Sequence, residues 1–286
     1  MTAGAAPNHG RRPAGAARQA AAPRQVNPLA TVVLAGNPSP MTLEGTNSWV
    51  LRAPGEESCV IVDPGPDIPE HLAALAATGP VRAILLTHGH VDHSEGAAAL
   101  HELTGAPVRA LDPTHRLGSE GLVEGDVVPG AGIELRVLAT PGHSADSLSF
   151  LLFGNVPGAS GTDPAAVLTG DTILGRGTTV VAFPDGRLAD YLDSLRRLAE
   201  LPAGLAVLPG HGPELADARG AASYYLSHRA ERLEQVRAAL AAAGVGPREA
   251  SPRAVVERVY ADVDPVLWPA AELSVRAQLD YLREHP

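Results

Sequence analysis

Three histidines and one aspartate occur within six residues of this chain, in the stretch THGHVDH at positions 87–93. Neutral imidazole nitrogens and carboxylate oxygens are good ligands for zinc-like cations. A spacing of two residues in a loop lets His88 and His90 point to the same side, and Asp92 and His93 can then serve a neighbouring ion. Core packing does not explain four ligand-type side chains after an apolar run, so we predict a metal site here.

Three later segments each place one ligand-type residue just after an apolar run that predicts a strand. They are TPGH with His143, GDT with Asp171 and PGHG with His211. Loops at the ends of strands lie along one edge of a sheet, where the rigid strands hold them in place. A single histidine or aspartate in a glycine-rich turn is usually only a turn residue, but three in series after the histidine cluster predict a shared site.

The elements that position these residues follow an α/β (α+β) pattern, in which short β-rich runs alternate with Gly/Pro turns and with Ala- and Leu-rich helical stretches. From Glu214 onward the strands stop and the pattern becomes helical, with a helix start at Ser251-Pro252 because serine is a good N-cap and proline suits the first helical position. We predict strands at 31–35, 48–52, 59–63, 82–87, 107–110, 133–139, 148–153, 166–169 and 205–208, and helices at 69–77, 94–103, 188–201 and 269–282. We therefore expect an unstructured tail at 1–27, a domain at 28–213 and a small helical domain at 214–286.

Composition excludes several classes of function. The formal net charge is −10, and all 22 basic residues are arginine, so Schiff-base and P-loop lysine chemistry are excluded. A body this acidic repels a polyanion at long range. No run approaches the roughly 18 apolar residues of a membrane helix, and residues 1–27 lack the apolar segment of a signal peptide. These features predict a cytoplasmic protein with no membrane partner.

The ligand motifs resemble those of the metallo-β-lactamase superfamily, because residues 88–93 match its His-x-His-x-Asp-His signature and the three later motifs follow in its order. The resemblance covers about residues 30–212 and implies an αββα sandwich with two metal ions between the sheets, here expected to be Zn²⁺ rather than iron or manganese. It also implies that Asp63 orients a ligating histidine. By this likeness the first ion is held by His88, His90 and His143, the second by Asp92, His93 and His211, and Asp171 bridges them.

The chemistry implied by such a site is hydrolysis. A water that bridges two cations loses a proton near neutral pH, although the pKa of free water is about 15.7, so hydroxide becomes the nucleophile. The second cation polarises the scissile carbonyl or phosphoryl oxygen. Asp92 and Asp171 are therefore the predicted catalytic residues, and Asp92 is also able to accept a proton from the attacking water. The site suits esters, thioesters, lactones, amides and phosphodiesters.

Further motifs resemble the β-lactamase-like protein 2 branch of the superfamily, which carries a C-terminal winged-helix-like domain. They are NP at 37–38, LEGTN at 43–47 and SHRAER at 227–232. The branch includes endoribonucleases that cut single strands, and its close relatives include thioesterases, so single-stranded RNA and an acyl thioester or other small ester are the candidate substrates. We predict that His228 and Arg229 bind an anionic group of the substrate at the metal cleft.

Duplex nucleic acid is not an expected partner. The chain ends a few residues beyond Leu282, so we expect the β-hairpin wing of a winged helix to be absent or vestigial. Residues 213–286 contain nine arginines and eleven acidic residues, without the basic stripe that is typical of nucleic-acid-binding domains.

Two alternatives to a zinc hydrolase stay open. One is an iron-dependent oxidoreductase of the same fold, because the His/Asp cluster also resembles that of persulfide dioxygenases and flavodiiron proteins. The other is a non-catalytic module that binds nucleic acid or protein and has a structural metal site. Structural zinc sites are usually closed and four-coordinate, whereas a set of seven ligands leaves room for water.

Overall fold

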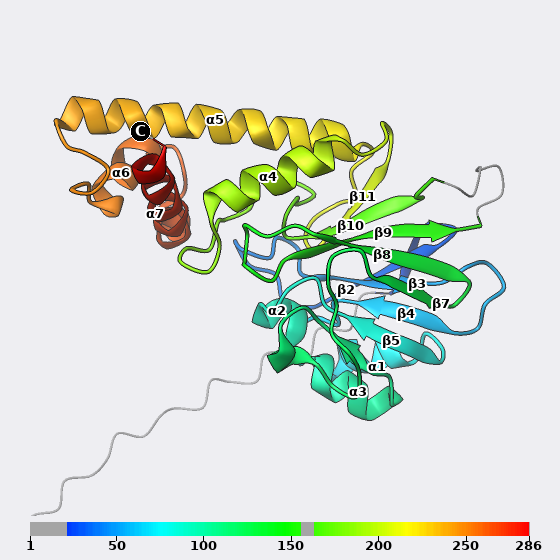
Figure 1. Ribbon diagram of the computed structural model, residues 1–286. Helices are drawn as coiled ribbons and strands as arrows, with labels where there is room; N and C mark the ends of the chain where they lie inside the picture. Colours follow the sequence, from blue (N-terminus) through cyan, green and yellow to red (C-terminus); the bar gives the residue numbers. More distant parts are fainter. Residues whose placement is uncertain (1–21, 156–162, 286) are drawn as a thin grey trace, which may run out of the picture.

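The protein, for which we have a computed structural model, is described here over residues 22–155 and 163–285. Two β-sheets face each other, and helices cover the outer side of each sheet (Figure 1). This arrangement confirms the predicted αββα sandwich. The first sheet has the strand order β1-β2-β3-β4-β5-β6, with β1 Arg24–Asn27, β2 Ala30–Leu34, β3 Asn47–Leu51, β4 Cys59–Val62, β5 Val81–Leu85 and β6 Val108–Arg109. The second has the order β11-β10-β9-β8-β7, with β7 Val127–Gly130, β8 Ile133–Ala139, β9 Leu148–Gly154, β10 Ala166–Gly170 and β11 Ala206–Pro209.

The outer layers are helical. Strands β1 to β4 pair antiparallel, whereas β4, β5 and β6 pair in parallel, which requires the helical crossovers that cover this sheet. Helix α4 covers the second sheet, and the long helix α5 packs against α4 (Figure 1). The helices are α1 Pro69–Ala76, α2 Val91–Ser94, α3 Ala97–Thr104, α4 Leu188–Ala199, α5 Ala218–Ala243, α6 Pro252–Val259 and α7 Trp268–Glu284, with short 3-10 helices at Pro113–His115 and Pro265–Leu267.

The first sheet is buried on both faces. In β4, Val60 and Val62 belong to the core between the two sheets, while Cys59 and Ile61 belong to the core under α1 and α3. Alternate side chains of a strand point to opposite faces, so both sets must be apolar. This explains why the sequence of β4 is a continuous apolar run. It also explains why the carboxyl end of β4 is rigid enough to hold Asp63, the residue that follows it, in place.

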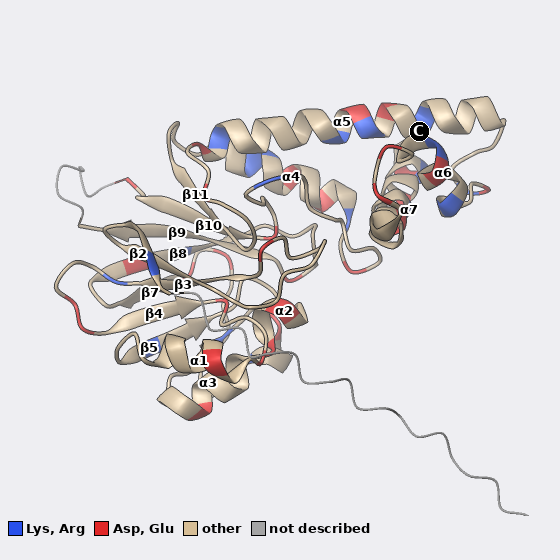
Figure 2. Cartoon of the chain, turned by 180° about the vertical axis from the view of Figure 1, so that it is seen from behind, with Lys and Arg blue, Asp and Glu red and all other residues tan. Residues whose placement is uncertain are grey.

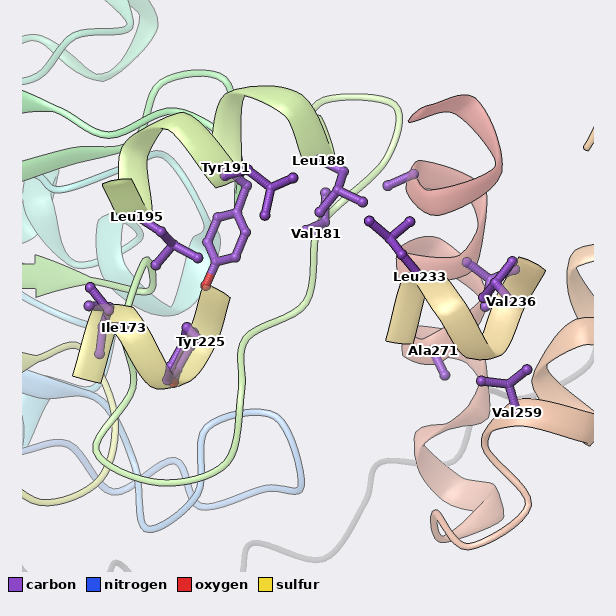
Figure 3. Close-up of a cluster of buried hydrophobic side chains, with 14 of the residues drawn as sticks. Ile173, Val181, Leu188, Tyr191, Leu195, Tyr225, Leu233, Val236, Val259 and Ala271 are labelled. Atoms are coloured by element: carbon purple, nitrogen blue, oxygen red, sulfur yellow. The ribbon is translucent and has the colours of Figure 1, made fainter. Parts of the chain in front are cut away.

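The C-terminal helices share a core with the second sheet. Buried side chains form one cluster that runs from Val167 of β10 through Tyr191 of α4 to Tyr225 of α5. Figure 3 shows Tyr191 pointing toward the turn of α5 that carries Tyr225, while Leu233 and Val236 lie farther along α5, toward α7. The 26-residue helix α5 is therefore anchored to the sandwich at one end and carries α6 and α7 at the other.

Two strands were not predicted from the sequence. Arg24–Asn27 forms β1, which pairs with β2, so the prediction of an unstructured tail over 1–27 is wrong for these four residues, and residues 1–21 lie outside the described residues. Val127–Gly130 forms β7 although Pro129 and Gly130 are rare in strands. A proline is tolerated there because β7 is an edge strand, whose outer backbone groups need no partner. Within the described residues, no helix combines the length and the apolar character needed to cross a membrane.

His71 of α1 provides a pH-dependent test of the fold. Its side chain is buried, with Nε2 2.9 Å from Ser48 Oγ. Burial lowers the pKa of His71 from 6.5 to about 4. The folded protein keeps this ring neutral, whereas the unfolded chain protonates it below about pH 6.5. The contribution of His71 to the free energy of unfolding is therefore fully present above pH 6.5 and is lost as the pH falls toward 4. Between pH 8 and pH 5 we expect His71 alone to lower the free energy of unfolding by about 2 kcal/mol.

Urea unfolding of the wild type and of His71→Gln at both pH values measures this contribution. The variant should lose about 2 kcal/mol less than the wild type on acidification, because glutamine does not titrate. Every other group titrates equally in the two proteins, so the same loss in both would contradict the prediction.

Candidate metal centre

The structure brings all seven predicted ligands together at one edge of the two sheets. They follow the carboxyl ends of strands from both sheets: His88 and His90 lie in the loop after β5, Asp92 and His93 on α2, and the others after β8, β10 and β11. His90 is the N-cap of α2, so the chain turns directly into this short helix and aims Asp92 and His93 back at the loop. The groups able to hold a cation are His88, His90 and His143; His88, His93 and Asp171; and Asp92, His93 and His211.

The first of these groups consists of three imidazoles. His90 Nδ1 lies 3.0 Å from His88 Nε2 and 3.0 Å from His143 Nε2. Two nitrogens that bind one tetrahedral zinc ion at about 2.0–2.1 Å lie about 3.3 Å apart. His90 Nδ1 lies at nearly this spacing from the other two nitrogens, and the three ligand atoms all lie within 4.8 Å of one another, so the group fits a cation.

A second group lies beside the first. His211 Nε2 is 3.2 Å from His93 Nε2 and 3.1 Å from Asp92 Oδ2. The Asp92 side chain is 26% exposed, whereas the two histidines are buried. This group therefore has one side open to solvent, unlike a closed structural zinc site.

Asp171 lies between the two groups. Its Oδ2 atom is 3.7 Å from His143 Nε2 of the first group and 3.4 Å from His211 Nε2 of the second. Its Oδ1 atom is buried and makes no hydrogen bond among the described residues, although His93 Nε2 lies 3.4 Å from it. A buried carboxylate oxygen without a hydrogen bond is costly, and a bound cation removes that cost. The donor set therefore fits two cations that share Asp171.

Each of four histidines has its second ring nitrogen held by another group. His93 Nδ1 lies 2.9 Å from Asp63 Oδ2, so Asp63 contacts one of the predicted ligating histidines. Such contacts fix the ring orientation and the tautomer of a metal ligand. The other three are His88 Nδ1 with Thr87 Oγ1 at 3.0 Å, His143 Nδ1 with the Val180 carbonyl at 2.7 Å, and His211 Nδ1 with the Gly45 carbonyl at 3.1 Å. The sequence does not identify the carbonyl partners, because any residue carries a carbonyl group.

Opposite charges are concentrated in this buried centre. Burial lowers the pKa of His88 well below its usual range, and nearby imidazoles lower it further. Burial also acts to lower the pKa of His93, but the carboxylates of Asp171 and Asp63 outweigh it and raise this pKa well above its usual range. Burial acts to raise the pKa of Asp171, yet His211 and His93 hold it well below its usual range. Positive charge on the imidazoles thus balances the carboxylates, a role that bound cations would take over.

Asp63 has a strained backbone that matches its contacts. Its φ is +54°, a region that aspartate and asparagine tolerate better than most residues. The buried carboxylate accepts the Thr87 backbone N–H at 2.8 Å and the Thr87 hydroxyl at 2.7 Å, in addition to its contact with His93. Asp63 therefore links the end of β4 to the end of β5 and orients His93.

Replacing Asp63 by Asn tests this role. Asparagine keeps the size and tolerates the backbone conformation, but it removes the charge that pairs with His93. We expect the weaker-bound metal ion to be held about 10- to 100-fold less tightly, because loss of such a partner has this typical effect. Competition with a chromophoric chelator measures the change, and the exposed Asp67→Asn serves as the control. Unchanged affinity in Asp63→Asn would show that His93 is positioned without Asp63.

A cavity of about 370 Å³ opens over this centre. His143 and Asp171 line it from the sandwich, and the predicted substrate-binding residues His228 and Arg229 line it from α5. The structure therefore places these two residues in the same cleft as two of the predicted ligands. Its apolar walls include Met41, Leu43, Leu174, Val180, Val263 and Leu267.

Helix α5 also holds the loop that follows Asp171. The Tyr225 hydroxyl accepts the Leu174 backbone N–H at 2.9 Å. An Nη2–H of Arg229 donates to the Thr179 carbonyl, and the Thr179 hydroxyl lies 3.1 Å from His143 Nδ1. Helix α5 is thus connected to two of the candidate ligands through one loop. No motif in the sequence indicated this connection, because it depends on the packing of α5 against residues 50 positions earlier.

Comparisons with known proteins agree with this geometry. Residues 41–156 match the family model of the metallo-β-lactamase superfamily, and residues 251–285 match that of the β-lactamase-associated winged helix domain. Within residues 163–285, no β-strand follows β11. The part of the chain that matches the winged helix domain is therefore helical, without a β-hairpin in the described residues. The matched region contains α6, the 3-10 helix Pro265–Leu267 and α7.

Curated relatives and solved structures are also similar. An atrochrysone carboxyl ACP thioesterase of Aspergillus fumigatus is 34% identical over 75% of this chain and 66% of the relative. A β-lactamase-like protein 2 homolog of Caenorhabditis elegans is 32% identical over 72% of this chain and 69% of the relative. The chain thus spans about two thirds of these relatives. The crystal structure of a β-lactamase domain protein from Burkholderia ambifaria has the same fold, with a TM-score of 0.72 and 23% identity over 92% of this chain and 88% of that chain.

Proposed function

This chain belongs to the metallo-β-lactamase superfamily of metal-dependent hydrolases, and we propose that it holds two zinc ions and hydrolyses an acyl thioester. The observation that carries the proposal is the position of Asp171, whose Oδ2 atom faces one nitrogen of each ligand group. Bound cations of this kind lower the pKa of a coordinated water to about 7, which supplies hydroxide near neutral pH. The reaction consumes one water, breaks the carbon–sulfur bond and yields a carboxylic acid and a thiol.

The residues of the chain have separate tasks in this proposal. His88, His90 and His143 would hold the first ion, Asp92, His93 and His211 would hold the second, and Asp171 lies between the two groups. Asp92 has the most exposed of the ligand carboxylates and is placed to accept a proton of the attacking water. Burial acts to raise the pKa of Asp92, but the His211 and His93 imidazoles hold it below its usual range, so this carboxylate is ionised at neutral pH.

The cleft favours an acyl chain over RNA. Its walls are largely apolar, which suits a hydrocarbon chain. Basic and acidic residues alternate along α5 without a continuous basic stripe (Figure 2). A strand of RNA needs such a stripe or a row of stacking aromatic residues. A curated relative is named as a thioesterase, which supports the same choice.

Metal analysis and a side-by-side assay test the proposal. Protein purified without added metal should contain about two zinc ions per chain, and one or more iron ions per chain would overturn the zinc assignment. The zinc-loaded protein is then given an acyl thioester, single-stranded RNA and a lactone. We expect turnover of the thioester. Cleavage of RNA alone would instead identify a nuclease, and no turnover by folded, loaded protein would favour a non-catalytic module.

A further inference from the structure

Arg229 is a buried cation that forms no ion pair with a carboxylate among residues 22–155 and 163–285. Its side chain is 3% exposed, and its guanidinium lies over the ring of Tyr191 at 5.1 Å. Its hydrogen bond goes to a backbone carbonyl, that of Thr179. Its Nε–H is buried and has no hydrogen-bond partner in the described part of the chain. Burying a charge is costly unless an opposite charge and hydrogen bonds compensate it, so this arrangement points to an anion that completes the site.

His228 provides a second unpartnered nitrogen in the same cleft. Its Nδ1 atom is buried without a hydrogen bond in the described residues, and its ring stacks on Tyr224 with 6.4 Å between ring centres. Burial lowers the pKa of His228, and the positive charges of Arg229 and Arg232 lower it further. Two adjacent residues of α5 thus line one cavity, and each has a buried nitrogen with no hydrogen-bond partner in the part of the chain that the structure describes.

The charges around this cavity have mostly one sign. Arg176, Arg229 and Arg232 line it, and the only acidic residue of its described lining is Asp171, which we have assigned to the metal centre. Arg176 pairs with Glu44, whereas Arg232 donates to the Val259 carbonyl at 2.8 Å. A locally positive cleft in a protein with a formal net charge of −10 concentrates anionic ligands at this place.

We propose that Arg229 and His228 bind a negatively charged group of the thioester, so that the cleft selects anionic acyl thioesters over neutral ones. This inference rests on the proposed function for the identity of the reacting group. The apolar wall takes the hydrocarbon part, and the two α5 side chains take the anion. The anion is either a carboxylate on the acyl chain or the phosphate of a phosphopantetheine arm on the thiol side, since both offer oxygens to the guanidinium.

Binding of unreactive thioethers separates this inference from catalysis. Three probes share an octyl chain: neutral S-octyl-N-acetylcysteamine, its analogue with a terminal carboxylate on the octyl chain, and S-octyl-phosphopantetheine. Calorimetric titration of the zinc-loaded protein should show about 10- to 100-fold tighter binding of one charged probe than of the neutral probe. The tighter probe identifies the source of the anion. Equal affinity for all three would overturn the inference, even if thioesters are hydrolysed.

Variants of α5 assign the preference to its residues. Arg229→Gln should reduce the preference for the charged probe by about tenfold, and His228→Ala should reduce it several-fold. Arg237→Gln is the matched control, because Arg237 is an exposed residue of the same helix that pairs with Glu234. If Arg229→Gln does not fold, the His228→Ala variant alone tests whether α5 causes the preference for the charged probe. A preference that is unchanged in His228→Ala, or that falls equally in Arg237→Gln, would contradict the assignment.

Discussion

Replacing Asp171 by Asn is expected to lower kcat/KM for the hydrolysed thioester roughly a thousandfold. Asp171 Oδ2 is 3.7 Å from His143 Nε2 and 3.4 Å from His211 Nε2, so one charged oxygen serves both ligand groups. Asparagine keeps the shape but removes the charge that two closely spaced cations require. We therefore also expect the metal content to fall from two ions per chain toward one.

Steady-state kinetics and elemental analysis of the same preparation measure both effects. Asp193→Asn is the control, since Asp193 is an exposed residue of α4 that pairs with Arg196. Circular dichroism shows whether the variant is folded. A folded Asp171→Asn protein that keeps two metal ions and full turnover would remove the basis of the proposed dinuclear centre.

Replacing Gly142 by Ala is expected to destabilise the protein by about 4 kcal/mol and to lower Tm by about 10 °C. Gly142 precedes the ligand His143 and has a φ of +135°, which side chains rarely adopt. A Cβ atom at this position would lie 2.3 Å from Tyr191 Cα and 2.4 Å from Tyr191 N. These are backbone atoms of α4, so the clash is relieved only by moving the helix or the His143 loop.

Gly204→Ala is a matched control for the backbone strain. Gly204 also has a positive φ, +75°, but no atom lies within 4 Å of the position of its Cβ. We expect this variant to lose only about 1 kcal/mol, the usual cost of a left-handed residue with a side chain. Thermal unfolding of both variants compares them directly. An equal loss of stability would show that the contact with α4 adds nothing to the backbone strain.

Much of the metal centre was predictable because each ligand follows a recognisable apolar strand. The cluster at 88–93 is local, and its spacing alone indicated ligation. His143, Asp171 and His211 are far apart in the sequence, but their common position after strands predicted that they meet. The structure brings them to within hydrogen-bond or ion-pair distance of the other ligands.

Errors arose where local signals were weak. Strand β1 lies next to an Ala- and Arg-rich segment and is stabilised by pairing with β2, which no local pattern shows. Strand β7 contains Pro129 and Gly130, which usually indicate a turn, and it forms because the second sheet offers it an edge. In both cases long-range pairing overrides the local preference of the residues.

The sequence alone determined which donor groups form the candidate site, because donor identity depends on residue type and on position relative to the strands. Only the tertiary structure determined which side chains surround these groups and how deeply they are buried. Arg229 is exposed or buried according to how α5 packs on α4, and its unpaired Nε–H becomes significant only once burial removes water. Electrostatic interactions depend on distance and solvent exposure, and neither is encoded at any single position of the chain.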